Sequence, residues 1–119
     1  MAHGDIMHTE IPVSDFDRAS AFYADLFGWE IVDTPGMPDY PTWMAPNRIS
    51  GGALTARGDG FSQPRSYVEV DSIDDVVAKT TAGGGSVLVP KDNITETSWW
   101  AVIADPEGNQ IGLFEGTMD

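Results

Sequence analysis

A histidine, an arginine and two carboxylates stand at alternating positions of two segments that are predicted to be β-strands. His8 with Glu10 suits general acid–base chemistry, because an imidazole and a carboxylate can pass a proton near neutral pH. Arg65 offers a planar fork of donors for a carboxylate or a phosphate, and its alternative role is an internal ion pair with Glu10 or Glu69. The candidate catalytic residues are therefore His8 and Glu10, and the reaction itself stays unknown.

Strand alternation predicts which side chains share a face with these groups. Neighbouring side chains of a strand point to opposite faces, so one set packs under a helix and the other lines a cleft. In the first strand, Ile11 and Val13 are expected under a helix, which turns His8 and Glu10 toward the cleft. The predicted ligand-binding residues are His8, Glu10, Trp43, Arg65, Tyr67, Glu69, Trp100, Gln110 and Phe114.

Two tryptophans of this set stand at equivalent places in the two halves of the chain. Trp43 and Trp100 could form aromatic walls for a flat ligand, and plain core packing is the alternative for both. Because Trp99 and Trp100 are neighbours on one strand, one of them is expected in the core and the other in the cleft.

An internal repeat organises the chain into two copies of one unit. Ile11–Asp17 matches Val68–Asp74, and Trp43 matches Trp100. Each copy reads as a strand, a helix and three strands, so the fold class is α+β, with two tandem βαβββ modules forming curved sheets around a shared cleft. A single domain is expected over 1–119, with module one at 5–56, a linker at 57–64 and module two at 65–116.

Capping residues and turns predict the element boundaries. The first helix is expected to begin at Ser14 or Asp15 and to end at Gly28. The second is expected to begin near Asp71 or Ser72 and to end at the glycine run 83–85. Segment Pro35–Pro41 is predicted to be a loop, either a lid or an inert connection, and Pro90–Asp92 is predicted to be a turn. The strands are expected at Ile6–Val13, Glu30–Thr34, Thr42–Ala45, Gly51–Ala56, Arg65–Val70, Ser86–Val89, Trp99–Ala104 and Gln110–Glu115.

Composition excludes several classes of function. The 119 residues are 41% hydrophobic and 21% charged, as in a folded globular domain. A net charge of −13 repels phosphate backbones, so nucleic acid is not an expected partner. The absence of cysteine excludes thiolate nucleophiles and cysteine-ligated zinc. No apolar run approaches the ~18 residues of a membrane span, and no leader peptide is visible, so we expect an acidic cytoplasmic protein without a membrane partner.

Several motifs together resemble a known superfamily. They are His8–Asp15, Arg18–Tyr23, Leu26–Trp29, Val70–Asp74 and Ala104–Asn109. With them the chain resembles, over nearly all of its length, the vicinal oxygen chelate superfamily, which includes glyoxalase I, bleomycin-resistance proteins and extradiol dioxygenases. The glyoxalase-like subgroup is the most similar. The resemblance implies the two-module fold, whereas many activities share this fold.

The resemblance also implies where a metal would bind. Metal-dependent members take four ligands, usually His or Glu, from four cleft-facing strand positions, and the matching positions here are His8, Ala53, Arg65 and Gly112. Only His8 can ligate, because Ala53 and Gly112 lack donor side chains and Arg65 is a permanent cation. No cofactor is therefore expected. The alternative is Zn, Ni, Mn or Fe at a rearranged site that adds Glu10, Tyr67 or Glu69.

Three functional hypotheses follow. The leading one is metal-independent binding of a small organic ligand, anionic or aromatic, in the cleft. The first alternative is an isomerase, lyase or dioxygenase of the same superfamily, with a rearranged metal site or acid–base chemistry based on His8. The second is a non-catalytic subunit or association domain. A homodimer is expected, since relatives of this fold commonly dimerise.

Overall fold

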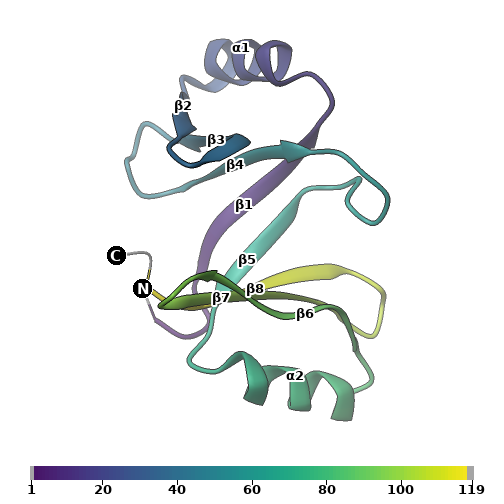
Figure 1. Cartoon of the computed structure of the whole chain (residues 1–119). Helices are drawn as coiled ribbons and strands as arrows, with labels where there is room; N and C mark the ends of the chain where they lie inside the picture. The colour runs from purple at the N-terminus through teal and green to yellow at the C-terminus, as the bar shows by residue number, and fades with distance from the viewer. Residues whose placement is uncertain (1, 118–119) are drawn as a thin grey trace. The chain divides into compact units, whose positions relative to one another are not determined.

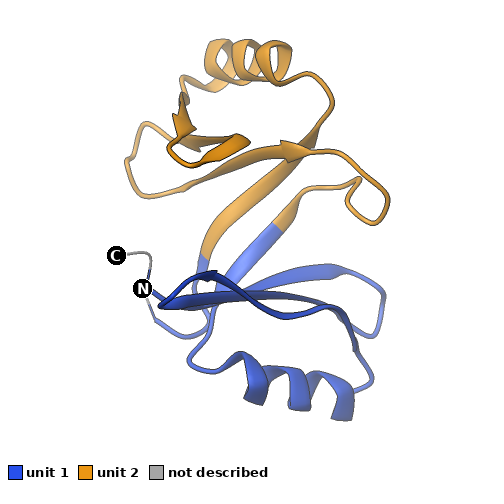
Figure 2. Ribbon diagram, in the orientation of Figure 1, with its two compact units in different colours: residues 1–6, 66–119 blue, residues 7–65 orange. Residues whose placement is uncertain are grey.

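A computed structural model describes residues 2–117 of the chain, and it confirms the predicted order of elements (Figure 1). A strand, a helix and three strands occur twice in succession, which is the α+β fold of two βαβββ modules. Contacts divide the chain into two compact units, residues 7–65 (unit 2) and residues 1–6 with 66–119 (unit 1) (Figure 2). The elements are β1 (Ile6–Val13), α1 (Phe16–Phe27), β2 (Glu30–Thr34), β3 (Met37–Met44), β4 (Gly51–Ala56), β5 (Arg65–Glu69), α2 (Ile73–Ala82), β6 (Ser86–Thr95), β7 (Ser98–Ala104) and β8 (Gln110–Gly116).

In unit 2 the strands lie in the order β2-β3-β4-β1, and helix α1 packs against one face of them. β1 and β4 are parallel, with Ile11 opposite Leu54, whereas β2–β3 and β3–β4 are antiparallel. The buried centre of the core is Val13, Trp43 and Leu54. The predicted alternation of β1 is confirmed, because both Ile11 and Val13 belong to this core. The half-buried residues packed around it are Ile11, Phe16, Ala19, Tyr23, Trp29, Ile31 and Ala45.

Unit 1 repeats this arrangement with the strand order β5-β8-β7-β6 and helix α2. β5 and β8 are parallel, with Val68 opposite Leu113, which is the pair equivalent to Ile11 and Leu54. The equal register confirms the internal repeat at the level of the backbone. The core combines buried Val70, Ile73, Ala101 and Leu113 with half-buried Val68, Val76, Val77, Trp99, Ile103 and Ile111.

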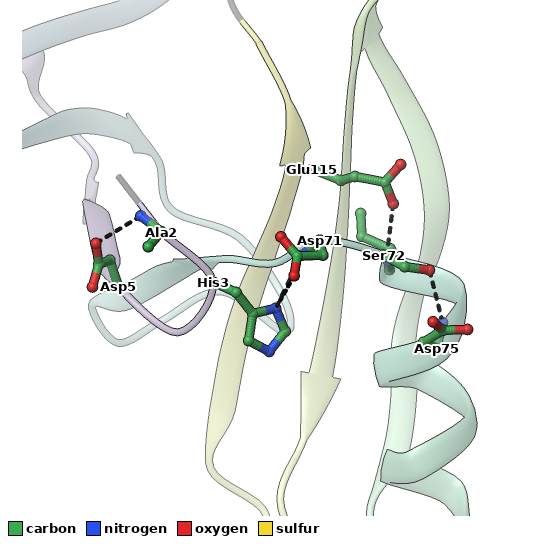
Figure 3. Close-up of polar contacts among 8 residues, drawn as sticks. Ala2, His3, Asp5, Asp71, Ser72, Asp75 and Glu115 are labelled. Atoms are coloured by element: carbon green, nitrogen blue, oxygen red, sulfur yellow. Dashed lines mark hydrogen bonds and ion pairs between the residues drawn. The ribbon is translucent and has the colours of Figure 1, made fainter.

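Side chains cap both helices at their N-termini. Asp15, the second of the two predicted starts, caps α1 and accepts a hydrogen bond from the backbone N–H of Arg18 at 3.0 Å. Ser72 caps α2 and accepts from the N–H of Asp75 at 3.1 Å (Figure 3). Glu115 of β8 accepts from the N–H of Ile73 at 2.7 Å, so the last strand also holds the start of α2. These bonds satisfy backbone donors that a helix leaves without partners.

Two predicted loops are strands in the structure, so those boundaries were wrong. Residues Met37–Pro41, assigned to a lid or connection, belong to β3, and only Pro35 and Gly36 form the turn before it. Residues 90–92 lie inside β6 rather than in a turn. The physical reason is that the prolines fall where the β2–β3 and β6–β7 registers shift, and a proline without an N–H is tolerated at such bulges.

Among the described residues, neither helix is long and apolar enough to cross a membrane.

Candidate functional site

Four polar side chains of unit 2 form one connected chain of hydrogen bonds. Nε2 of His8 lies 2.8 Å from the hydroxyl oxygen of Tyr40. That hydroxyl donates to Oε2 of Glu10 at 2.7 Å. Nη2 of Arg65 donates to Oε1 of Glu10 at 3.3 Å, where the two side chains form an ion pair. The structure therefore brings together three of the predicted site residues, and it adds Tyr40 between them.

The strands explain how these groups meet. Alternation along β1 turns His8 and Glu10 to the face opposite Ile11 and Val13, which pack in the core. Tyr40 follows Asp39, a non-glycine residue with φ 59°, at the register shift between β2 and β3. Such irregularities re-aim side chains. The carbonyl of Tyr40 accepts from the Thr34 hydroxyl at 2.7 Å, which fixes the bulge where the phenol reaches its partners.

The ion pair at the centre of the chain is almost fully buried. Glu10 is 8% exposed and Arg65 is 9% exposed. Taking two charges out of water costs several kcal/mol per ion, so the pair persists only with good partners on both groups. The ring of Phe61 lies over the guanidinium, 4.5 Å from its Cζ to the ring centroid, and shields one face of it. Arg65 is therefore held from two sides, by a carboxylate and by an aromatic ring.

The hydrogen bonds also assign the protons along the chain. Tyr40 donates its single proton to the acceptor-only carboxylate of Glu10, so its oxygen accepts from Nε2–H of His8. The basic nitrogen of a neutral His8 is then Nδ1. Burial lowers the pKa of His8 below its usual value of 6.5, and the negative charge of Glu10 opposes that shift. His8 is therefore uncharged at neutral pH.

Apart from Trp43, the remaining predicted site residues lie in unit 1, on the face of its strands opposite the α2 core. Cross-strand register places Tyr67 beside Gly112, and places Phe114 beside both Glu69 and Trp100. Tyr67 and Phe114 are buried, whereas Glu69, Trp100 and Gln110 are half-buried.

Strand alternation separates Trp99 from Trp100, and core packing places Trp43. Trp99 packs in the α2 core, so Trp100 lies on the other face, as predicted for one of the two. Trp43 lies in the α1 core, where its ring stacks on Trp29 with 3.7 Å between centroids. A Cβ on Gly52 would collide with the backbone carbonyl of Thr9 and would also come within 2.8 Å of Nε1 of Trp43, so only glycine fits at this position. Trp43 is thus placed away from the face that carries His8 and Glu10.

Tyr40 and Phe61 are the two members of the site that sequence reasoning missed. Tyr40 lies in a segment that was predicted to be a loop, and Phe61 lies in the predicted linker 57–64. Hydrophobic periodicity predicts which face a side chain occupies only within regular strands. It therefore did not predict where the side chains of Tyr40 and Phe61 point. The register shift beside Tyr40 and the turn that holds Phe61 appear only in the folded chain.

The residues at the four metal-ligand positions implied by the resemblance do not make a ligand set. Ala53 is completely buried and has no donor atom. Arg65 is a cation that already pairs with Glu10. A Cβ on Gly112 would lie 2.6 Å from Cγ of Tyr67, so the tyrosine ring fills the space beside that backbone. Within residues 2–117, no three His, Cys, Asp or Glu side chains are grouped to hold a metal ion.

Similar sequences agree with the fold. Residues 5–42 match the family model of the bleomycin resistance protein-like N-terminal region. A "Glyoxylase-like domain-containing protein" of Didymella fabae is 32% identical over 94 residues, which cover 72% of this chain and 73% of the relative. The "Putative glyoxylase CFP32" of Mycobacterium bovis is 31% identical over 114 residues, covering 89% of this chain. The match is 43% of that mycobacterial relative, so the chain spans less than half of its length.

A solved structure extends the comparison to three dimensions. The Mn(II)-bound glyoxalase from Novosphingobium aromaticivorans superposes with a TM-score of 0.68 at 20% identity, covering 96% of this chain and 39% of that one. At this identity the likeness establishes the fold, which is therefore shared with a glyoxalase that binds Mn(II). By sequence and by fold, the chain belongs to the glyoxalase/bleomycin-resistance/dioxygenase superfamily, the vicinal oxygen chelate superfamily.

Proposed function

We propose that the protein binds a small organic molecule, without a metal ion, at the chain formed by His8, Tyr40, Glu10 and Arg65. The observation that carries the proposal is the buried Glu10–Arg65 ion pair, with Nη2 of Arg65 at 3.3 Å from Oε1 of Glu10. A buried ion pair adds little to stability, because apolar residues of similar volume serve a core as well or better. A buried ion pair is instead useful in a binding site, where a ligand needs a positive charge at a fixed position.

The chemistry of these four hydrogen-bonded side chains supports an anionic or aromatic ligand. Arg65 supplies a permanent positive charge, which is what a metal ion supplies elsewhere in the superfamily. Phe61 and Tyr40 offer aromatic surface beside that charge. The ligand contacts that the sequence predicts in unit 1 stay predictions of their own. They are Tyr67, Glu69, Trp100, Gln110 and Phe114.

The proposal is tested by ligand screening in the presence and absence of a chelator. Organic acids and aromatic molecules are screened by thermal shift, and hits are measured by calorimetry with EDTA and with added Zn, Ni, Mn or Fe. We expect the same affinity in all conditions. Arg65→Lys keeps the charge but loses the planar fork, so affinity is expected to fall at least tenfold. The exposed Arg48, paired with Glu30 at 3.4 Å, gives the matched control Arg48→Lys, which should bind normally.

Two results contradict this function. One is a full equivalent of metal per chain, by mass spectrometry of protein purified without added metal, together with loss of binding in EDTA. The other is a set of ligands whose affinities are equal in the wild type and in Arg65→Lys.

One observation favours a second candidate, acid–base catalysis. The lowered pKa of His8 leaves the imidazole neutral at neutral pH, with Nε2–H donated to Tyr40 and Nδ1 as its base. A neutral imidazole held this way can remove a proton next to a carbonyl. NMR in D2O would report exchange of such protons in small ketones and oxo acids. Exchange by the wild type that His8→Gln abolishes supports catalysis, and equal rates in the two proteins contradict it.

A further inference from the structure

The carboxylate of Glu10 lies between two donors, each of which holds one of its oxygens. The phenol of Tyr40 donates to Oε2 and the guanidinium of Arg65 donates to Oε1. We propose that Tyr40 and Arg65 form a carboxylate-binding site which Glu10 fills in the absence of ligand, and that the natural ligand is a small monocarboxylate that takes Glu10's place. This inference rests on the proposed function and names its ligand class.

The two distances show why Glu10 can be exchanged. The contact of Tyr40 with Oε2, at 2.7 Å, is a short and well-formed hydrogen bond. The contact of Arg65 with Oε1, at 3.3 Å, is longer than the roughly 2.7–2.9 Å of a good charge-assisted bond. Glu10 is tethered to β1 and cannot move freely toward the guanidinium. A carboxylate that arrives on a free ligand has no such tether and can form the two parallel bonds that arginine makes best.

The side chains around Arg65 leave the edge of its guanidinium, rather than its covered face, for a ligand to approach. Phe61 covers a face of Arg65 at 4.5 Å, so a ligand meets the N–H groups at the rim of the planar group. The rings of His8 and Tyr40 are nearly parallel, with an interplanar angle of 10° and centroids 6.2 Å apart, and they form an aromatic border near the carboxylate. A ligand with a flat or apolar body beside its carboxylate fits this arrangement.

Charge balance favours a monocarboxylate over a phosphate. Arg65 is the cation paired with Glu10, and a chain of net charge −13 adds no excess positive field. A phosphate dianion would bring two negative charges to that cation, and burying unpaired charge is costly. A monocarboxylate replaces the charge of Glu10 by an equal one. It also reproduces the planar, two-oxygen group that the donors already hold.

Chemical rescue tests the site. Glu10→Ala removes the CH2–COO⁻ group from the side chain, and acetate restores almost the same atoms as a free molecule. We expect sodium acetate to raise the melting temperature of Glu10→Ala in a saturable manner, with a dissociation constant at least tenfold lower than for the wild type. Sodium chloride at equal ionic strength should not do so. The double variant Glu10→Ala/Arg65→Lys should show at least a tenfold weaker effect.

The exposed ion pair of unit 2 provides the matched control. Glu30 pairs with Arg48 at the surface at 3.4 Å, so Glu30→Ala removes the same group from a solvated pair. Acetate should not stabilise Glu30→Ala more than chloride does, because water already competes for that arginine. Equal responses of Glu10→Ala and Glu30→Ala to acetate overturn the inference.

A second variant keeps the test decisive if Glu10→Ala does not fold. Glu10→Gln keeps the shape of the side chain and removes the charge that holds Arg65. Benzoate is then expected to bind at least fivefold more tightly than to the wild type, by calorimetry, and equal or weaker binding overturns the inference.

A ligand that binds the wild type through Arg65 but is neutral or phosphorylated leaves the proposed function intact and overturns the carboxylate class. If acetate stabilises Glu10→Ala but no screened molecule binds the wild type, the result supports the carboxylate site and contradicts the proposed function.

Discussion

The two modules share one backbone plan and carry different side chains at equivalent places of their parallel strand pairs. In unit 2, Glu10 of β1 lies in register with Ala53 of β4. In unit 1, Tyr67 of β5 lies in register with Gly112 of β8. The carboxylate of Glu10 reaches the charged partner Arg65, whereas the ring of Tyr67 lies against the backbone of Gly112.

The difference shows that the same parallel strand pair can hold a buried carboxylate in one unit and an aromatic ring in the other. Removing the last methyl group, from alanine to glycine, lets an aromatic ring settle on the strand and fill the space with apolar atoms. Val102 and Phe114 of the same unit are buried as well. Unit 2 has Ala53 and Glu10 at the same places. The buried carboxylate of Glu10 needs partners, because an unpaired buried charge is costly. The buried charges of the candidate site therefore lie in unit 2.

The largest effect is expected when the ion pair of unit 2 is broken. Arg65→Met leaves the carboxylate of Glu10 buried without its cation, which should lower the free energy of unfolding by about 3–5 kcal/mol. The matched variant Arg48→Met breaks an exposed pair and should cost at most about 1 kcal/mol. Urea denaturation of both proteins measures the difference. Similar losses in the two variants would mean that the pair of unit 2 behaves as a surface pair.

The double variant sharpens this prediction. Arg65→Met with Glu10→Met replaces both charges by apolar groups of similar size. It should recover most of the lost stability, because no uncompensated charge remains. A double variant as unstable as Arg65→Met alone would show that packing around Arg65, rather than charge, dominates.

A smaller effect is expected in unit 1 when Gly112 gains a methyl group. Gly112→Ala would place Cβ 2.6 Å from Cγ of Tyr67, so the ring must move and the free energy of unfolding should fall by about 1–3 kcal/mol. Thermal and urea denaturation give this loss. Gly58→Ala is the control, since a Cβ there would meet nothing within 4 Å. If Gly112→Ala matched Gly58→Ala in stability, the glycine would not be what admits the ring.

The smallest effect concerns the proton on His8 of unit 2. Burial lowers the pKa of His8 in the folded protein, while an unfolded histidine titrates near ~6.5. The unfolded state therefore binds more protons just below that pH. The contribution of His8 to stability is fully present above pH ~6.5 and is lost as the pH falls toward its lower folded-state pKa.

Urea denaturation at pH 7.5, 6.5 and 5.5 checks this sign. The wild type should lose more stability over this range than His8→Gln, whose side chain does not titrate. His3, the other histidine of the chain, is half exposed, and His3→Gln should keep the dependence of the wild type. An unchanged pH dependence in His8→Gln would mean that another group carries it.

Much of the fold was predictable because its signals are local. Helix starts at Asp15 and Ser72 follow from capping side chains, and the glycine at position 28 adopts the left-handed φ of 70° that ends α1. The strand at 30–34 and that at 51–56 were predicted with their exact bounds. β3 was predicted too short, since its prolines look like turn residues until the register shift of its partner strand accommodates them.

The candidate site was predictable only in part. Alternation correctly turned His8 and Glu10 away from the core, because Ile11 and Val13 must pack under α1. The ion pair between Glu10 and Arg65 was one of two alternatives for that arginine, and it is the one observed. Trp43 had equal reason to face either side of its strand. Its stacking on Trp29 depends on how α1 and β3 pack.

The sequence by itself determined the two βαβββ modules, their order and the face on which each regular strand presents its polar residues. These properties depend on periodicity, caps and repeats, which act over a few residues. Only the tertiary structure decided that Tyr40 joins His8 to Glu10 and that Phe61 covers Arg65. The first of these contacts joins β3 to β1, which lie 30 residues or more apart in the sequence, and it depends on a bulge. The second depends on the turn between Phe61 and Arg65, whose direction no local pattern encodes. Side-chain direction at such places is set by packing and by the need to pair buried charge.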